Sequence, residues 1–400
     1  MAARAVRAFG DGFVSVLLPA YLLALGLGDV QIGAVATATL LGSALLSLVV
    51  GLGAGRAPWR SLLLGAALLM AVTGVAFGTV RDFWPLLLVA FIGTLNPSAG
   101  DVSVFLPLEQ TVLPQTVGAS SRTALFARYS LVGSLAAACG ALCAGVPAFL
   151  AARTSLGQTD ALGGMFWLYG LLGLAAFGLY RRLSPSIEAQ RTSQAPLREA
   201  RRTVFTLAAL FCLDSFGGGL VVQALLALWL FERFGLSTVL AGTVFFWTGV
   251  LSALSYPIAS WLAGRVGLIN TMVFTHLPSN VLLMLVPFMP SLPLALGLLL
   301  ARSALSQMDV PTRSSYVMAV VPPEKRPAAA SVTSVPRSLA SAASPLLAGY
   351  LFGLSVFGWP LVLAGALKGV YDLLLLRQFA AVRPPEEADQ LCGRPSLSAP

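Results

Sequence analysis

Charged residues are scarce in this sequence. Aspartate, glutamate, lysine and arginine together make up 10% of the 400 residues, where about 25% is usual in soluble proteins. Hydrophobic residues make up 57% of the chain. A water-soluble protein of this length could not cover its surface with so few charges, so we expect lipid to surround most of the side chains. The composition excludes a cytosolic enzyme, a disulfide-stapled secreted domain and a disordered or fibrous chain.

Histidine and cysteine are also rare, with one histidine and four cysteines in the chain. Cys139 and Cys143 lie one helical turn apart in an apolar run, Cys212 lies in another run and Cys392 lies near the C-terminus, which does not form a disulfide framework. Without a His/Cys cluster we expect no zinc or haem site and no cofactor. The net charge is +9, but the basic residues are scattered between apolar runs, so we predict no nucleic-acid partner.

Long apolar runs are abundant. A membrane-crossing helix needs about 20 mostly apolar residues. The runs are continuous and do not alternate with period two, which favours helices over transmembrane strands. We therefore predict an all-α membrane protein with twelve transmembrane helices, at residues 5–26, 31–54, 61–79, 84–113, 122–150, 163–181, 204–231, 239–262, 270–289, 293–321, 328–354 and 359–380.

The placement of arginine predicts the orientation. With the N-terminus inside, the outer loops hold only Arg81, Arg153 and Arg233, and most other basic residues lie in the inner segments. We therefore expect a multi-pass protein of the cell (inner or plasma) membrane, a monomer in the lipid bilayer, with both termini cytoplasmic. One sizeable polar segment, residues 182–203, separates six spans from six. We therefore expect an N-terminal six-helix bundle (1–181), a cytoplasmic linker (182–203), a C-terminal six-helix bundle (204–380) and a disordered cytoplasmic tail (381–400).

The two halves of the chain resemble each other. At a constant offset, Pro85 matches Pro293, Ser98 matches Ser306, Asp101 matches Asp309 and Pro114 matches Pro322. Paired Asp and Pro at one offset are harder to obtain by chance than paired Leu or Ala. Since each half has six spans, we expect two parallel repeats related by a pseudo-two-fold axis along the membrane normal, with a cavity between them near the middle of the bilayer.

A motif follows the second span of each half. Residues 51–60 read GLGAGRAPWR, and residues 260–267 read SWLAGRVG. With the two six-span halves and the basic central loop, these turns resemble the loop signature of the major facilitator superfamily, with Gly55 in the place of its aspartate. The resemblance implies a twelve-helix transporter working by alternating access, with Arg56 and Arg265 in its gating loops. It also implies that the first, fourth, seventh and tenth spans line the pathway.

Ionisable side chains inside the spans are the candidate site residues, because each one is costly in lipid. Three pairs four residues apart could neutralise themselves within one helix: Arg7–Asp11, Asp309–Arg313 and Lys368–Asp372. The remaining charges have no opposite charge at three or four positions and must find partners on other helices, face water or be protonated. They are Asp101, Glu109, Asp214, Arg128, Arg302 and Arg337. The single histidine, His276, is expected to hydrogen-bond inside the protein.

The tenth span has a polar face. Taken as one helix, it places Arg302, Ser306, Asp309, Arg313 and Tyr316 within an arc of about 80°, and such a face must line protein or water. The eleventh span carries Arg337 with Thr333 and Ser341. Two readings stay open for the three arginines: fixed positive charge for an anionic or carboxylate-bearing substrate, or salt bridges between helices that hold one conformation.

Residues that couple proton movement to transport are expected among the carboxylates inside the spans. By the resemblance to the major facilitator superfamily, four aspartates fall on the spans that line the pathway: Asp11, Asp101, Asp214 and Asp309. Of these, Asp101 and Asp214 have no local counter-ion and are the candidates for proton coupling. Gly217, Gly218 and Gly219 in the seventh span and the Asn96-Pro97 pair in the fourth are expected to weaken the helical backbone or to allow close packing.

The hypothesis is a secondary active transporter that moves a small organic solute by alternating access. Proton-coupled efflux, as an antiporter, is the favoured mode. The alternative is a passive facilitator, an uptake carrier or a non-transporting receptor on the same scaffold. An enzyme is not expected, because the sequence has neither a G-x-S-x-G nor an H-E-x-x-H motif.

Overall fold

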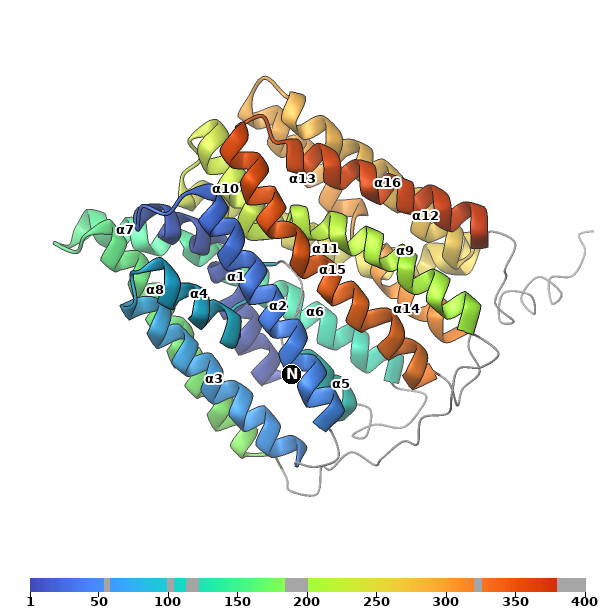
Figure 1. Ribbon diagram of the computed structural model, residues 1–400, viewed down its shortest axis with the longest axis horizontal. Helices are drawn as coiled ribbons and strands as arrows, with labels where there is room; N and C mark the ends of the chain where they lie inside the picture. The colour runs from blue at the N-terminus through green and yellow to red at the C-terminus, as the bar shows by residue number, and fades with distance from the viewer. Residues whose placement is uncertain (54–57, 99–103, 113–121, 184–200, 320–325, 380–400) are drawn as a thin grey trace, which may run out of the picture.

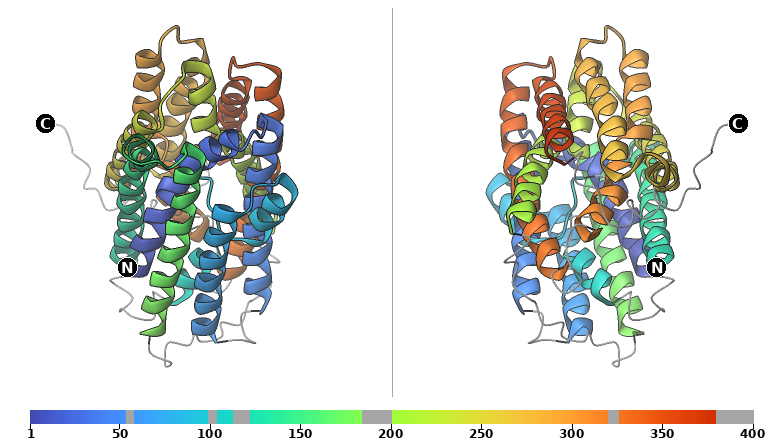
Figure 2. Two further views of the ribbon diagram at one scale, coloured as in Figure 1. Left: turned by 90° about the vertical axis from the view of Figure 1, so that its left-hand side faces the viewer. Right: turned by 90° about the vertical axis from the view of Figure 1, so that its right-hand side faces the viewer.

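The computed structural model describes residues 1–53, 58–98, 104–112, 122–183, 201–319 and 326–379, and these residues contain helices but no strand. Eight of the twelve predicted spans are single α-helices: α1 (Ala2–Ala24), α2 (Asp29–Gly53), α3 (Trp59–Thr79), α8 (Gln158–Arg181), α11 (Thr238–Val266), α12 (Leu268–Leu285), α15 (Arg326–Leu354) and α16 (Trp359–Phe379). The helices run roughly along one common direction (Figure 2), as the prediction of a transmembrane bundle requires.

The other four spans are interrupted. They comprise α4 (Phe83–Ile92) with α5 (Phe105–Val112), α6 (Arg122–Leu142) with α7 (Val146–Arg153), α9 (Arg201–Leu220) with α10 (Gln223–Phe234), and α13 (Leu292–Leu305) with α14 (Asp309–Ala319). Short 3₁₀ turns lie between α6 and α7 (Cys143–Gly145) and after α12 (Val286–Phe288). By length and hydropathy alone, nine segments of the described chain could cross a membrane. The fourth, tenth and eleventh spans are not among these nine segments. The fourth and tenth are divided into helices that are too short, and the eleventh is rich in serine and contains Arg337.

The tenth span is not the single helix that the sequence predicted. Helix α13 ends at Leu305, residues 306–308 form a turn, and α14 begins at Asp309. Pro311 stands in the first turn of α14, where its missing N–H is tolerated, whereas in mid-helix it would break the hydrogen-bond ladder. The single polar face predicted for this span is therefore wrong, because Arg302 lies on a separate helix from Asp309 and Arg313.

The fourth and seventh spans break where the sequence weakens the backbone, and the two breaks touch. Helix α4 ends just before the Asn96-Pro97 pair, and α9 passes through the three glycines and ends at Leu220. The backbone N–H of Ala224 lies in the first turn of α10, where the helix itself offers no acceptor. It donates instead to the carbonyl of Pro97 at 2.9 Å. One residue earlier, the Gln223 amide donates to the Ser15 hydroxyl of α1 at 2.8 Å. These bonds join the two halves of the chain at their broken helices.

The helices of the two halves pack in equivalent ways, as expected if a two-fold rotation exchanges the halves. In the first half α1 packs on α6 and α8, α3 on α8, and α2 on α4. In the second half α9 packs on α15 and α16, α12 on α16, and α11 on α13. Between the halves α2 packs on α15 and α6 on α11, and Figure 1 shows α2 and α15 side by side. Each contact is matched by the one expected when span n is exchanged for span n + 6, as in a duplicated bundle.

Helices α2 and α15 approach closely where α2 begins and α15 ends. A Cβ atom on Gly33 would lie 2.7 Å from the carbonyl oxygen of Pro345, and both Pro345 and Gly349 are buried. Ser334 and Ser338 lie on the same face of α15, eleven residues before Pro345 and Gly349, and both are exposed. The halves therefore meet where α2 begins and α15 ends, and they part toward the other end of the bundle.

A glycine contact between α1 and α6 gives a first test of the packing. A Cβ atom on Gly140 would lie 2.0 Å from the carbonyl oxygen of Phe9, whereas one on Gly65, an exposed residue of α3, would meet nothing within 4 Å. Gly140→Ala must push the two helices apart, and we expect it to lower the free energy of unfolding by about 1–3 kcal/mol. In the matched control, Gly65→Ala leaves that free energy unchanged or raises it by up to about 1 kcal/mol. Denaturant titration in detergent measures both, and equal effects would contradict the packing.

Candidate functional site

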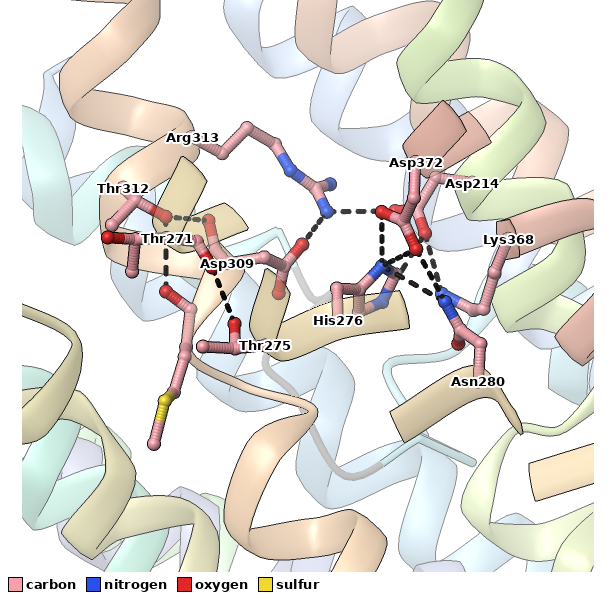
Figure 3. A network of polar contacts seen from close by, with 11 residues as sticks. Asp214, Thr271, Thr275, His276, Asn280, Asp309, Thr312, Arg313, Lys368 and Asp372 are labelled. Carbon is pink, nitrogen blue, oxygen red and sulfur yellow. Dashed lines mark hydrogen bonds and ion pairs between the residues drawn. The ribbon is translucent and has the colours of Figure 1, made fainter. Parts of the chain in front are cut away.

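A buried ion pair joins the seventh and tenth spans. Arg313 of α14 lies between two carboxylates: its Nη2 donates to Asp214 Oδ2 of α9 at 2.9 Å and to Asp309 one helical turn earlier (Figure 3). All three residues are buried. The predicted local pair Asp309–Arg313 is therefore present, and Asp214, which had no local counter-ion, finds one on another helix. Aromatic rings cover the guanidinium, with its central carbon 5.2 Å from the Phe211 ring and 5.8 Å from the Tyr371 ring.

Lys368 of α16 supplies a second cation to Asp214. Its Nζ lies 2.7 Å from Asp214 Oδ1, so the predicted local pair Lys368–Asp372 is wrong. The glycines of α9 explain the outcome. The lysine chain crosses α9 where a Cβ on Gly217 would lie 3.1 Å from Lys368 Cγ, so a larger residue would obstruct it. A buried carboxylate with no partner on its own helix is thereby reached by a cation from the neighbouring helix.

Asp372 pairs with the single histidine. His276 of α12 places Nδ1 at 2.9 Å and 3.1 Å from the two carboxylate oxygens of Asp372. The Asn280 amide, one turn along α12, donates to Asp372 Oδ2 at 2.9 Å. The other ring nitrogen, Nε2, lies 3.9 Å from Asp214 Oδ1. His276 therefore does bond inside the protein, as predicted, and it connects the Asp372 pair to the Asp214 network (Figure 3).

Two further arginines have no ion pair within the part of the chain that the structure describes. They are Arg337 of α15, which lies near this network, and Arg302 of α13, which lies apart from it. The Nε atom of Arg302 is enclosed and has no hydrogen-bond acceptor. Arg337 lies near enough to Arg313, Asp214 and Asp309 to feel their charges. Both residues are partly buried, and a cation withdrawn from water without a counter-ion is costly, so both guanidinium groups can bind an anion.

The first half holds a related cluster with the charges exchanged. Arg7 of α1 donates from Nη2 to Glu109 Oε2 of α5 at 2.6 Å and from Nε to the Tyr180 hydroxyl of α8 at 3.1 Å. The Tyr180 and Tyr129 hydroxyls also donate to Glu109. The pairing of Arg7 and Glu109 joins the first and fourth spans, as that of Asp214 and Arg313 joins the seventh and tenth. In each half a buried ion pair therefore joins the two corresponding spans, with the cation on the first span in one half and on the tenth span in the other.

The remaining predicted site residues are dispersed. Asp11 is buried on α1, while Asp101 and Arg56 lie outside the described residues. Arg265 is exposed in the last turn of α11, and its guanidinium stacks 4.1 Å from the Trp261 ring. The structure thus brings Asp214, Asp309 and Arg313 into one network, with Arg337 close by, and places Arg302 apart on α13. Among the described residues no group of three or more His, Cys, Asp or Glu could hold a metal ion.

Sequence reasoning missed several members of the two clusters. Lys368 and Asp372 were assigned to each other, and Glu109, Tyr129 and Tyr180 were not placed in a site. The available signal was that Glu109 and Asp214 had no partner within their own helices, so each required one from another helix. The identity of the partners depends on helix packing, which one sequence does not provide.

The comparisons with known proteins agree on the fold. Residues 1–308 match the family model of the Major Facilitator Superfamily. An uncharacterized membrane protein of Saccharomyces cerevisiae, YJR124C, is 23% identical over 413 residues, covering 94% of this chain and 92% of the yeast protein. The xylose transporter XylE from E. coli, in an inward open conformation, superimposes with a TM-score of 0.71 at 14% identity, covering 98% of each chain. The human organic anion transporter MFSD10 superimposes with a TM-score of 0.62 at 17% identity, covering 93% and 97% of the two chains.

Proposed function

Because the chain belongs to the Major Facilitator Superfamily, and is thus a multi-pass membrane transporter and not an enzyme, we propose that it is a secondary active transporter of a small organic anion. It exchanges the solute for protons, exports it, and works by alternating access as a monomer in the cell membrane, with both termini cytoplasmic. The substrate carries a carboxylate or a comparable anionic group.

The unpaired guanidinium groups of Arg302 and Arg337 carry this proposal. In the same bundle Arg313 is paired with two carboxylates and Arg7 with Glu109. Arg302 and Arg337 are partly buried and have no ion pair within the described chain, so their guanidinium groups are available to bind a ligand. A guanidinium binds a carboxylate through two parallel hydrogen bonds, stronger than those between neutral groups. The resemblance in fold to a protein described as an organic anion transporter supports the same substrate class.

Alternating access has support from the contacts between the halves. The close approach of α2 and α15 lies where α2 begins and α15 ends, while Ser334 and Ser338 on the same face of α15 are exposed toward the other end. The bonds from Gln223 to Ser15 and from Ala224 to Pro97 hold the closed side. A conformation open to the opposite side requires these bonds to break, and the interrupted helices allow the backbone to bend there.

The test is flux in vesicles reconstituted with the purified protein. A panel of carboxylates, phosphate esters, amines and uncharged solutes is offered with and without a pH gradient. We expect the anionic solutes alone to move, and their movement against a concentration gradient to require the pH gradient. Flux that never exceeds equilibration would identify a passive facilitator, movement of amines would exclude the anion site, and no flux of any solute would contradict transport of this class.

A further inference from the structure

His276 occupies a position that transport of the solute alone does not explain. It lies on α12, in the ninth span, outside the first, fourth, seventh and tenth spans on which the aspartates lie. Its side chain is buried, with 3% of the residue exposed. Proton coupling requires a group that gains and loses a proton at physiological pH, and histidine is the side chain whose ordinary titration falls in that range.

The ring is fixed between two carboxylates. Nδ1 faces both oxygens of Asp372 and lies 3.2 Å from the Asn280 amide nitrogen, which donates to Asp372 at 2.9 Å. With the Asp372 carboxylate as acceptor for both groups, the neutral ring carries its hydrogen on Nδ1. Nε2 then presents a lone pair toward Asp214 Oδ1 at 3.9 Å. In the neutral ring this lone pair and the Asp214 carboxylate repel each other. When Nε2 binds a proton, the ring becomes positively charged and attracts the carboxylate. The Tyr371 ring holds the imidazole edge-on, with 6.1 Å between centroids, so the ring cannot readily turn away.

Several charged groups surround the ring. Helices α9, α14 and α16 present Asp214, Asp309, Arg313, Lys368 and Asp372 to the network around His276. In direct contact these are three carboxylates against two fixed cations, and Arg337 forms no ion pair within the described chain but lies close enough to interact with Asp214 and Asp309. The group that takes the proton is therefore selected by position: Nε2 of His276 faces Asp214 Oδ1.

From this geometry we infer that Nε2 of His276 is the site that binds the coupled proton, with Asp372 as its positioning residue and Asp214 as its counter-charge. The inference rests on the proposed function, because it names the group that carries the proton in that transport. It also replaces Asp214 as the candidate carrier: Asp214 contacts both Arg313 and Lys368, and their charges favour its ionised form.

One measurement observes the proton directly. Because the chain has a single histidine, protein labelled with ¹⁵N-histidine and purified through a histidine-free tag gives one imidazole to follow by nuclear magnetic resonance. We expect the Nε2 resonance to change from that of an unprotonated to that of a protonated ring nitrogen as the proton binds. Asp372→Asn removes the carboxylate that faces Nδ1 and should alter this change, whereas the surface variant Asp160→Asn should leave it as it is in the unaltered protein. An imidazole whose signals stay constant as the pH is lowered would overturn the inference.

The second measurement connects the proton to transport. In His276→Gln, and in His276→Asn as a second variant, the anionic solute should still equilibrate down its own gradient, but a pH gradient should no longer drive accumulation. Thermal denaturation in detergent confirms that each variant is folded. Accumulation that still follows the pH gradient in either folded variant would overturn the role of His276. If the unaltered protein moves no solute, the proposed function fails, while the resonance titration still decides whether His276 binds a proton.

Discussion

Asp214→Asn is expected to lower the free energy of unfolding by about 3–5 kcal/mol, because it leaves two buried cations without their shared carboxylate. Arg313 keeps Asp309, but Lys368 loses the negative charge of the carboxylate whose oxygen lies 2.7 Å from its Nζ. The lysine cannot reach water, since only 8% of the residue is exposed. Denaturant titration of the purified protein in detergent gives the value.

The control is the same substitution in an exposed pair. Asp160 bonds Arg81 at 2.6 Å, with more than half of each side chain exposed. Asp160→Asn should therefore cost at most about 1 kcal/mol. Adding Lys368→Met to Asp214→Asn removes the stranded cation and should restore most of the lost stability. Equal effects of Asp214→Asn and Asp160→Asn, or no recovery in the double variant, would show that the buried network does not hold the bundle together.

Arg337→Gln should abolish transport without destabilising the protein. Since Arg337 has no ion pair within the described chain, its removal strands no carboxylate. The apparent affinity for an anionic solute should fall by about 100-fold, as expected when a ligand charge loses a buried partner worth about 2–5 kcal/mol.

Asp309→Asn should also abolish transport and remain folded, because Arg313 keeps Asp214. Flux and thermal denaturation are measured on the same preparations.

The matched control is Arg153→Gln, an exposed arginine at the end of α7. It should transport like the unaltered protein, which separates the role of Arg337 from a general effect of lost positive charge. Normal flux in both Arg337→Gln and Asp309→Asn would exclude the proposed site. Loss of stability in Arg337→Gln would show that its guanidinium has a structural partner.

The bundle could be predicted from the sequence because lipid imposes a simple rule. About 20 apolar residues make a span, and each of the twelve predicted spans contains α-helix in the structure, eight of them as a single helix. The interruptions were predictable only in part. The Asn96-Pro97 pair and the three glycines marked the fourth and seventh spans, but Pro311 was not recognised as the start of a new helix.

The partners of the buried charges could not be predicted in the same way. Spacing shows which residues can meet on one helix, and it was right for Asp309 and Arg313. It was wrong for Lys368, because Asp214 on a neighbouring helix had no partner and the glycines of α9 left a path to it. Arg7 bonds Glu109 of α5, a partner that spacing along α1 could not indicate. These choices depend on which helix faces are in contact, which is a property of the folded bundle.

The central claim is that the face of α15 carrying Arg337 borders a water-accessible cavity between the halves. Ser338 and Leu339 lie at nearly the same depth in α15, next to Arg337, and both are exposed. Successive residues point about 100° apart, and Leu339 shares its direction with the exposed Leu346 on the outer surface of the bundle. The two positions therefore form a matched pair of exposed side chains on different faces of α15, and the account predicts that Ser338 faces the cavity and Leu339 faces lipid.

The most direct measurement is the reactivity of a cysteine at each position toward a membrane-impermeant, negatively charged methanethiosulfonate, in reconstituted protein whose four native cysteines are replaced. We predict that Ser338→Cys reacts and Leu339→Cys does not, and that a transported anion slows the reaction at Ser338→Cys. Reaction at Leu339→Cys alone, or at neither position, would contradict the account.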